Sequence, residues 1–301
     1  MRKPVTWCLL IDGTGNARES TDTNIWRLYN LLQADGQRVH YFEGVGTNED
    51  NVFLKFAGGA FGAGALILRD QVCATIRSDY QDGDRILVAG FSRGAAIARK
   101  VCSELGLPVD FLVCFDTVGA MLIFDDFHVS PLVKQAYHAC SIHERRKVFE
   151  LAQMNQRDDG SVCEEWFMGG HSDIGGGAEN SDGTINHNLS NISLIEAITR
   201  IQMQGIHFDP TAAKVFPTNI SQPPYVIEWL RRADRQVRVQ VNDEHSLREI
   251  PRLHKTVPLS EQERLLSRGL ISFKGVRAIP FAISRDEAYD ARGNIIPTDS
   301  L

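Results

Sequence analysis

The chain has 301 residues, of which 43% are hydrophobic and 23% charged, a balance typical of soluble proteins that bury a sizeable core. This composition excludes a disordered chain. The formal net charge of -6 at pH 7 provides no basic surface for a phosphate backbone, so we expect no nucleic-acid partner. No apolar run reaches the ~18 residues that a membrane-spanning helix requires.

The six cysteines are scattered, form no C-x-x-C pair, and in several cases lie inside apolar runs. This pattern favours reduced, buried thiols over a disulfide framework or a zinc site. The apolar run after the basic N-terminus is too short for a signal peptide, so we expect the protein to be cytoplasmic where it is synthesised. The cysteines are Cys8, Cys73, Cys102, Cys114, Cys140 and Cys163.

The first half of the chain alternates continuous apolar runs, typical of strands buried in a parallel sheet, with patterns of helical spacing. The run 5–11 ends in the polar turn DGTGN, and the helical pattern 24–32 follows it with Thr23 as N-cap. The same alternation predicts strands at 39–42, 85–89 and 112–115, and helices from about 65 to 80 and after GFSRG.

The second half of the chain is predicted to hold, in order, a helix at 131–152, a strand at 164–168, a helix at 189–204, and short strands at 237–241 and 276–283. The alternation predicts an α/β fold of the α/β-hydrolase type, a mostly parallel sheet with helices on both faces. We expect residues 1–301 to form a single domain with a region appended from about residue 205. The loops at the carboxyl ends of the strands should carry the chemistry.

The sequence Gly90-Phe91-Ser92-Arg93-Gly94 is a G-x-S-x-G motif between a buried strand and a helix, the context of a nucleophile elbow. The two glycines allow a sharp turn that holds the serine in a strained conformation at a helix N-terminus. The alternative is a serine in an ordinary strand-to-helix turn. We expect Ser92 to be the nucleophile of a serine hydrolase.

A serine hydroxyl needs a base, and the base needs an orienting acid. Asp116 follows the next strand, and His171 lies in the loop GGHSDIGGG after a later one, which satisfies the order Ser, Asp, His of this fold. Alternatively, Asp116 caps the turn before Thr117, and Asp173 is either the acid or a partner of the glycine-loop amides. Histidines in or beside regular patterns are weaker candidates for the base: His40, His128, His138, His143 and His207.

The oxyanion hole of this fold combines the amide of the residue after the nucleophile, here Arg93, with an amide from a loop after an early strand. The loop DGTGN is the natural source of the second amide, because its glycines let amides point at one spot. Gly13 and Thr14 are the candidates, with Asp12 in a supporting role. The alternative is phosphate binding, but the loop lacks both the Gly-Lys-Ser/Thr ending of a P-loop and the full G-x-G-x-x-G fingerprint.

Several separated segments together resemble one family, the bacterial and fungal α/β-hydrolases of formerly unknown function that include type VI secretion phospholipase effectors. These segments span about residues 8–194 and read LLIDGTGN, EGVGTN, GGAFGAGA, DGDRILVAGFSRGAAIAR, FDTVGA, HERRKVF, EEWFMGGHSDIGGG and LSNISL. The resemblance implies Ser92 as nucleophile, Asp116 as acid and His171 as base. It also implies hydrolysis of glycerophospholipid or related ester bonds.

The chain departs from the family pattern in two places. His143 stands where the family usually has Asp, and the tail after Gly205 is compact. The secreted relatives often carry membrane-anchoring segments, of which we expect none here. The resemblance still leaves open peripheral membrane contact, export without a signal peptide, and an immunity or secretion partner.

The expected function is hydrolysis of a small-molecule or lipid ester through an acyl-enzyme, with no metal or organic cofactor. One alternative is a non-catalytic binding or regulatory module that keeps the fold. Another is a hydrolase of a sugar ester, peptide or cell-wall substrate, which would use the same machinery. Apolar residues that could line an acyl pocket, or simply pack a helix, are Phe53, Leu54, Phe56, Phe61, Leu66 and Leu68.

Overall fold

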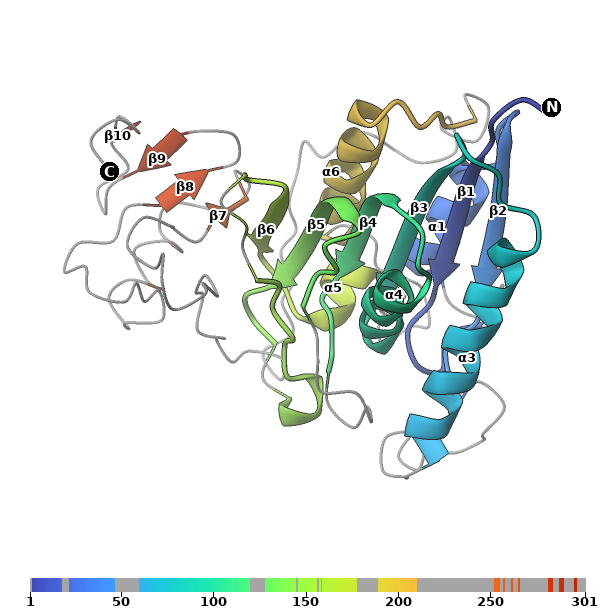
Figure 1. Ribbon diagram of the computed structural model, residues 1–301. Helices are drawn as coiled ribbons and strands as arrows, with labels where there is room; N and C mark the ends of the chain where they lie inside the picture. Colours follow the sequence, from blue (N-terminus) through green and yellow to red (C-terminus); the bar gives the residue numbers. More distant parts are fainter. Residues whose placement is uncertain are drawn as a thin grey trace.

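A computed structural model describes most of the chain up to residue 209 and short pieces beyond it (Figure 1). The described residues are 2–17, 22–46, 60–119, 128–144, 146–155, 157, 159–177, 189–209, 252–254, 257, 261, 265, 281–283, 287–289 and 295–296.

Six parallel strands form the centre of the sheet. Their carboxyl ends lie at one edge, where the loops 12–16, 92–93, 116–119 and 168–171 emerge. In spatial order the strands are β2 (Gln37–Phe42), β1 (Thr6–Ile11), β3 (Arg85–Phe91), β4 (Val109–Phe115), β5 (Val133–Ser141) and β6 (Val162–Phe167).

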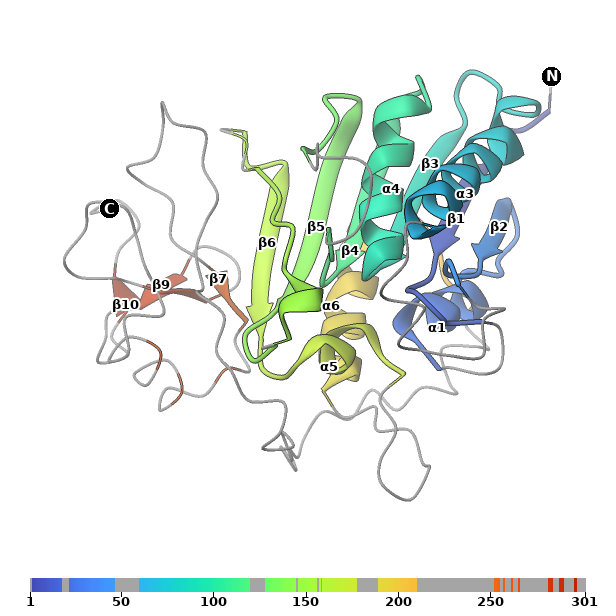
Figure 2. The same cartoon turned by 90° about the horizontal axis from the view of Figure 1, so that it is seen from below.

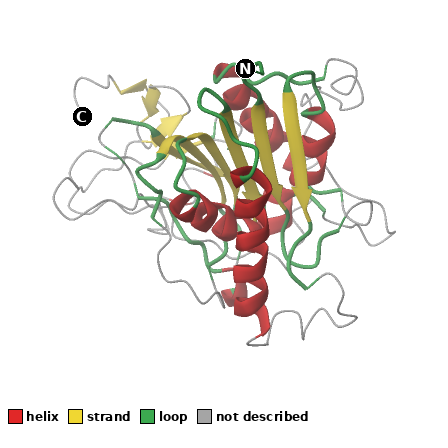
Figure 3. Ribbon diagram, turned by 45° about the vertical axis from the view of Figure 1, so that its right-hand side comes forward, coloured by secondary structure: helices red, strands yellow, loops and turns green. Residues whose placement is uncertain are grey.

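Helices cover both faces of this sheet, as Figures 2 and 3 show. On β1, Cys8 and Leu10 face the core that α1 and α6 cover, whereas Trp7, Leu9 and Ile11 face the core that α3 and α4 cover. A strand buried on both faces is uniformly apolar, which explains the continuous runs in the sequence. The helices are α1 (Asn24–Leu31), α3 (Ala60–Arg77), α4 (Arg93–Glu104), α5 (His171–Gly175) and α6 (Ser190–Met203).

The α/β fold class is confirmed, and so are the strands and helices expected before residue 116. Thr23 caps α1 as expected, since its side chain accepts a hydrogen bond from the amide of Trp26. The six cysteines are free and buried, as the sequence indicated. Among the described helices, none is long and apolar enough to cross a membrane.

The helix predicted at 131–152 is wrong, because Val133–Ser141 form strand β5 and only Lys147–Phe149 form a short 3-10 turn. Apolar residues at positions 133, 136, 137 and 140 mimic helical spacing. The last six residues of β5 are all buried, because β4 and β6 flank the strand and both faces are covered. A strand inside a parallel sheet shows no polar alternation that would reveal it.

Short strands continue the sheet beyond β6, first parallel at β7 and β8 and then antiparallel. They are β7 (Arg252–Leu253), β8 (Phe281–Ile283), β9 (Glu287–Tyr289) and β10 (Ile295–Ile296). Strand β8 falls within the predicted strand 276–283, whereas the one predicted at 237–241 lies outside the described residues. The single-domain interpretation of residues 1–301 stays a prediction.

Candidate active site

Ser92 lies where the chain passes directly from β3 into α4. Its φ of 58° and ψ of -127° define a conformation that costs a non-glycine residue about 1–3 kcal/mol and recurs at functional sites. Two glycines make this turn feasible. A Cβ on Gly94 would lie 2.2 Å from the carbonyl oxygen of Asp12, and one on Gly90 would lie 2.6 Å from Cα of Ala95. The strained turn predicted at Ser92 is therefore present, with α4 starting in close contact with β1.

Asp116 follows β4 and His171 follows β6, the two strands that flank β5, and their side chains meet in a buried hydrogen bond. Asp116 Oδ2 is 2.7 Å from His171 Nδ1, and Asp116 Oδ1 accepts a 2.8 Å hydrogen bond from the amide of Ser141. Because the carboxylate accepts, Nδ1 carries the proton and Nε2 is the basic nitrogen. Asp116 is fully buried and has a φ of 40°, a region that Asp tolerates better than most residues.

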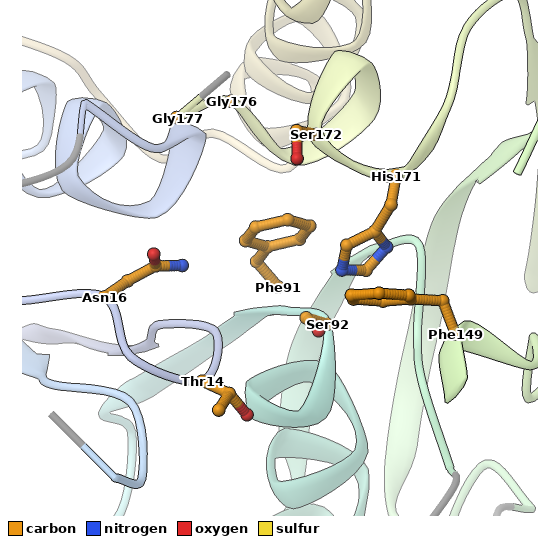
Figure 4. A pocket seen from close by; sticks show the side chains of 9 residues that line it. All are labelled: Thr14, Asn16, Phe91, Ser92, Phe149, His171, Ser172, Gly176 and Gly177. Carbon is orange, nitrogen blue, oxygen red and sulfur yellow. The ribbon is translucent and has the colours of Figure 1, made fainter. Parts of the chain in front are cut away.

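Ser92 and His171 line the same pocket of about 130 Å³, and the imidazole points toward the serine (Figure 4). The ring is held between two aromatic side chains, with centroids 4.7 Å from Phe91 and 4.5 Å from Phe149. The Ser92 hydroxyl makes no hydrogen bond with a described residue. The remaining lining residues are Thr14, Asn16, Ser172, Gly176 and Gly177.

The loop DGTGN borders the pocket, but one of its two candidate amides is already used. The amide of Gly13 donates to Asp12 Oδ1 at 2.7 Å, so Gly13 is not available as an oxyanion donor in this structure. The amide of Thr14 has no acceptor among the described residues, and Thr14 lines the pocket. Arg93 is the first residue of α4, so its amide lies at the helix N-terminus beside Ser92.

Asp12 holds this loop against its surroundings. Its carboxylate also accepts hydrogen bonds from the side chains of Asn16 at 3.3 Å, Thr23 at 2.5 Å and Tyr41 at 2.8 Å. Burial raises the pKa of Asp12 to about 6, although these four hydrogen bonds oppose the shift. The supporting role expected for Asp12 is thus to shape the loop, and Asp12 does not contact His171.

Asp173 takes the second of the two roles that the sequence left open. Its Oδ2 accepts a 2.8 Å hydrogen bond from the amide of Gly170, and its own amide donates to the Gly170 carbonyl at 3.0 Å. These contacts close the first turn of α5. The acid beside the imidazole is Asp116, which argues against Asp173 as the orienting acid.

The sequence did not single out the turn after β5, which contacts both Asp116 and His171. Ser141 reaches Asp116 as described above, and Glu144 Oε2 accepts a 3.0 Å hydrogen bond from the amide of His171. The segment HERRKVF, part of the resemblance, was the available signal. His143, which departs from the family pattern, is buried, accepts from the amide of Gly169, and contacts Glu261 Oε1 at 2.8 Å.

His138, Cys140 and Glu164 form a buried group whose ligand atoms lie within 4.8 Å of one another, close enough to hold a metal ion. His138 Nδ1 is 2.7 Å from Glu164 Oε1, and its Nε2 accepts from the amide of Thr117 at 3.0 Å. Glu164 Oε1 also accepts from the amide of Met154. The ring nitrogens of His138 and the Oε1 atom of Glu164 are thus already engaged in hydrogen bonds. Through the amide of Thr117, this group supports the loop that follows Asp116.

The family model described as "T6SS, Phospholipase effector Tle1-like, catalytic domain" matches residues 6–107 and 102–199, which together make up more than half of the chain. The chain belongs to this Tle1-like family of type VI secretion phospholipase effectors. A comparison with curated protein sequences found no match.

Solved structures with a related fold include the Tle1 effector bound to the VgrG spike of the type VI secretion system. That match has a TM-score of 0.51 at 18% identity and covers 73% of this chain and 76% of that chain. At this identity it shows a shared Tle1-like fold. An uncharacterized protein from Pseudomonas aeruginosa aligns with a TM-score of 0.47 at 18% identity, over 70% of this chain and 48% of that one. The chain thus aligns with about half the length of the Pseudomonas protein.

Proposed function

We propose that the chain is a carboxylic ester hydrolase (EC 3.1.1) that cleaves acyl esters of phospholipids with Ser92 as nucleophile, His171 as base and Asp116 as orienting acid. The observation that carries the proposal is the meeting, in one pocket, of a serine in a strained strand-to-helix turn with a carboxylate-bound imidazole. Membership of the Tle1-like family supports a lipid ester as the substrate.

The reaction proceeds in two halves that use the same base. His171 Nε2 takes the proton of the Ser92 hydroxyl, Oγ attacks the acyl carbonyl, and the imidazolium returns the proton to the departing alcohol. Water then attacks the acyl-enzyme, with His171 accepting its proton, and the fatty acid leaves as Ser92 regains its hydrogen. Asp116 keeps the proton on Nδ1 and stabilises the imidazolium through the 2.7 Å hydrogen bond.

The negative charge on the carbonyl oxygen is stabilised by backbone amides in this proposal. Arg93 is the first residue of α4, directly after Ser92, and Thr14 of the DGTGN loop lines the same pocket as Ser92. Two amides held in place by glycine-assisted turns need no rearrangement during the reaction. Since Gly13 donates to Asp12, we assign the second amide to Thr14.

Labelling with a fluorophosphonate, mapped by mass spectrometry, tests the nucleophile. We expect labelling of the wild type at Ser92 only, and none of Ser92→Ala. Ser103→Ala is the matched control, because Ser103 is an exposed serine near the end of α4, and it should label like the wild type. Absence of labelling in a folded wild type would contradict the catalytic proposal and favour a binding module.

Release of fatty acid from phospholipid vesicles tests the substrate class. Ser92→Ala should lower this release by at least about 10⁴-fold. If the wild type hydrolyses a soluble p-nitrophenyl ester but releases no fatty acid from any phospholipid, the chain is a hydrolase of a non-lipid ester.

We further propose export by a type VI apparatus, with a spike protein as partner and peripheral contact with the target membrane. The family description supports this step, and a protein of the same fold has been solved on a VgrG spike. Co-purification with a VgrG spike protein tests this proposal, and a clean failure to bind at micromolar concentrations would count against it.

A further inference from the structure

The 141–144 turn, which begins at the last residue of β5, lies between the proposed acid, Asp116, and the proposed base, His171. In the sheet, β5 is flanked by β4, which precedes Asp116, and by β6, which leads to His171. The residues that follow β5 can therefore touch both loops. No other described strand end has this position.

Hydrogen bonds from this turn reach both sides. The amide of Ser141 donates to Asp116 Oδ1 at 2.8 Å, and its hydroxyl donates to the carbonyl of Gly169 at 2.7 Å. The same hydroxyl accepts from the amide of Glu144 at 3.1 Å, and Glu144 Oε2 accepts from the amide of His171 at 3.0 Å. One four-residue turn thus fixes the acid loop and the base loop relative to each other.

The Glu144 carboxylate is almost completely buried, with 1% of its side chain exposed. A buried carboxylate is stable only when it is paired and hydrogen-bonded. Arg146 provides three donors, its amide at 2.8 Å, Nε at 2.8 Å and Nη2 at 2.7 Å. Burial raises the pKa of Glu144, but Arg146 and the amide of His171 outweigh burial and bring this pKa to about 2.

Arg146 also reaches the imidazole ring indirectly, through the side chain of Phe149. Its guanidinium carbon lies 4.0 Å from the centre of the Phe149 ring, and that ring lies 4.5 Å from the His171 ring. The Glu144–Arg146 pair therefore restrains both the backbone and one ring face of the base. A bidentate carboxylate–guanidinium pair has a fixed geometry, which a single lysine contact lacks.

We propose that Glu144, paired with Arg146, is a positioning residue that sets where the His171 imidazole stands between Ser92 and Asp116. It touches neither substrate nor the reacting atoms, so its contribution is to geometry. This inference rests on the proposed hydrolase function. A rival role for the half-exposed Arg146, binding the phosphate of a phospholipid, is less favoured because its charge is already paired.

The test compares Glu144→Gln and Arg146→Lys with the wild type, using a short p-nitrophenyl ester and phospholipid vesicles. Each kcat is normalised to the sites that a fluorophosphonate labels at saturation, which removes misfolded protein from the comparison. A displaced base should lower kcat in Glu144→Gln by about 10- to 100-fold on both substrates, with KM for the soluble ester changed less than kcat. Arg146→Lys, which keeps the charge but not the fork, should retain intermediate activity.

Glu104→Gln is the matched control. Glu104 is also ion-paired, with Arg69 at 2.8 Å and Lys100 at 3.0 Å, but it lies at the end of α4 that is far from Ser92. The kcat of Glu104→Gln should therefore equal that of the wild type. An unchanged kcat per labelled site in Glu144→Gln would overturn the proposal. A rise confined to KM for phospholipid in Arg146→Lys would overturn it in favour of phosphate binding.

These results separate the inference from the function on which it rests. If the wild type is neither labelled nor active, the proposed hydrolase function fails. If the wild type is active and the variants match it, only the positioning role fails. If Glu144→Gln does not fold, Arg146→Lys still tests the proposal, because Arg146 is half-exposed and its replacement should be tolerated. A lower kcat in that variant supports the positioning role, and a wild-type kcat contradicts it.

Discussion

The imidazole of His171 is restrained by groups from several parts of the fold. Asp116 binds Nδ1, Glu144 binds the backbone amide, and the rings of Phe91 and Phe149 lie against it. Each contact removes a freedom of motion before substrate arrives. The contacts together fix the position of the imidazole more firmly than any one of them could. In the proposed mechanism this matters because even a small displacement of the base lowers the reaction rate by a large factor.

The orienting role proposed for Asp116 is tested with Asp116→Asn. Asn tolerates the positive φ at this position, so we expect the variant to fold. Its oxygen would keep the Ser141 contact while its amide donates to His171 Nδ1, which moves the imidazole proton to Nε2 and blocks base catalysis. We expect kcat to fall by about 10⁴-fold.

Asp173→Asn is the comparison for that experiment, because Asp173 is the other acid of the same region and bonds to the Gly170 amide. Its loss in kcat should be much smaller, as an Asn oxygen can accept the same hydrogen bond. A larger loss in Asp173→Asn than in Asp116→Asn, measured on the p-nitrophenyl ester, would reverse the assignment of the acid.

The contact between α4 and β1 positions Ser92 at the level of secondary-structure elements. Helix α4 can start directly after Ser92 only because Gly94 lets its first turn approach the backbone of Ile11 and Asp12. The same approach brings the DGTGN loop beside Ser92. A side chain at position 94 would separate the helix from the strand.

Gly94→Ala should therefore destabilise the fold, by about 1–3 kcal/mol or more, because the added Cβ meets backbone atoms that cannot rotate away. The control is Gly64→Ala in α3, where the added Cβ would lie 3.7 Å from Val45 Cγ1, an ordinary contact. That change should stabilise the protein by up to about 1 kcal/mol through helix propensity. Urea unfolding of both variants checks the opposite signs, and equal effects would refute this account.

At the scale of the whole molecule, the described pieces of the tail contact the part of the sheet that precedes His171. Strand β7 pairs with β6, the amide of His254 donates to the carbonyl of Trp166, and Glu261 contacts His143. His254 also lies 3.8 Å from Glu196 of α6. The tail thus supports β6 and the turn after β5 together.

Folding stability should depend on pH through Asp12, which links β1, β2 and the cap of α1. Burial raises the pKa of Asp12 in the folded protein to about 6, against about 3.9 in an unfolded chain. Its stabilising contribution is therefore complete below about pH 4 and is lost as the pH rises through about 6. The loss amounts to about 3 kcal/mol over that interval.

Urea unfolding at pH 4.5 and pH 7 measures this dependence. Asp12→Asn removes the titrating group and should show a flatter profile than the wild type between these two pH values. An identical slope in the variant would show that Asp12 is ionised in the folded protein at pH 4.5.

The sequence by itself determined the fold class and the strained turn at Ser92. It also indicated that Asp116 and His171 both follow strands of the sheet and come after Ser92 in the chain. Those features depend on local chemistry, such as glycines flanking a serine and polar loops after apolar runs. It failed at β5, because burial on both faces erases the alternation that marks a strand. Only the tertiary structure could show that Asp12 uses the Gly13 amide and that Glu144 reaches His171. Contacts of this kind join residues through the order of strands in the sheet, and a linear pattern does not record that order.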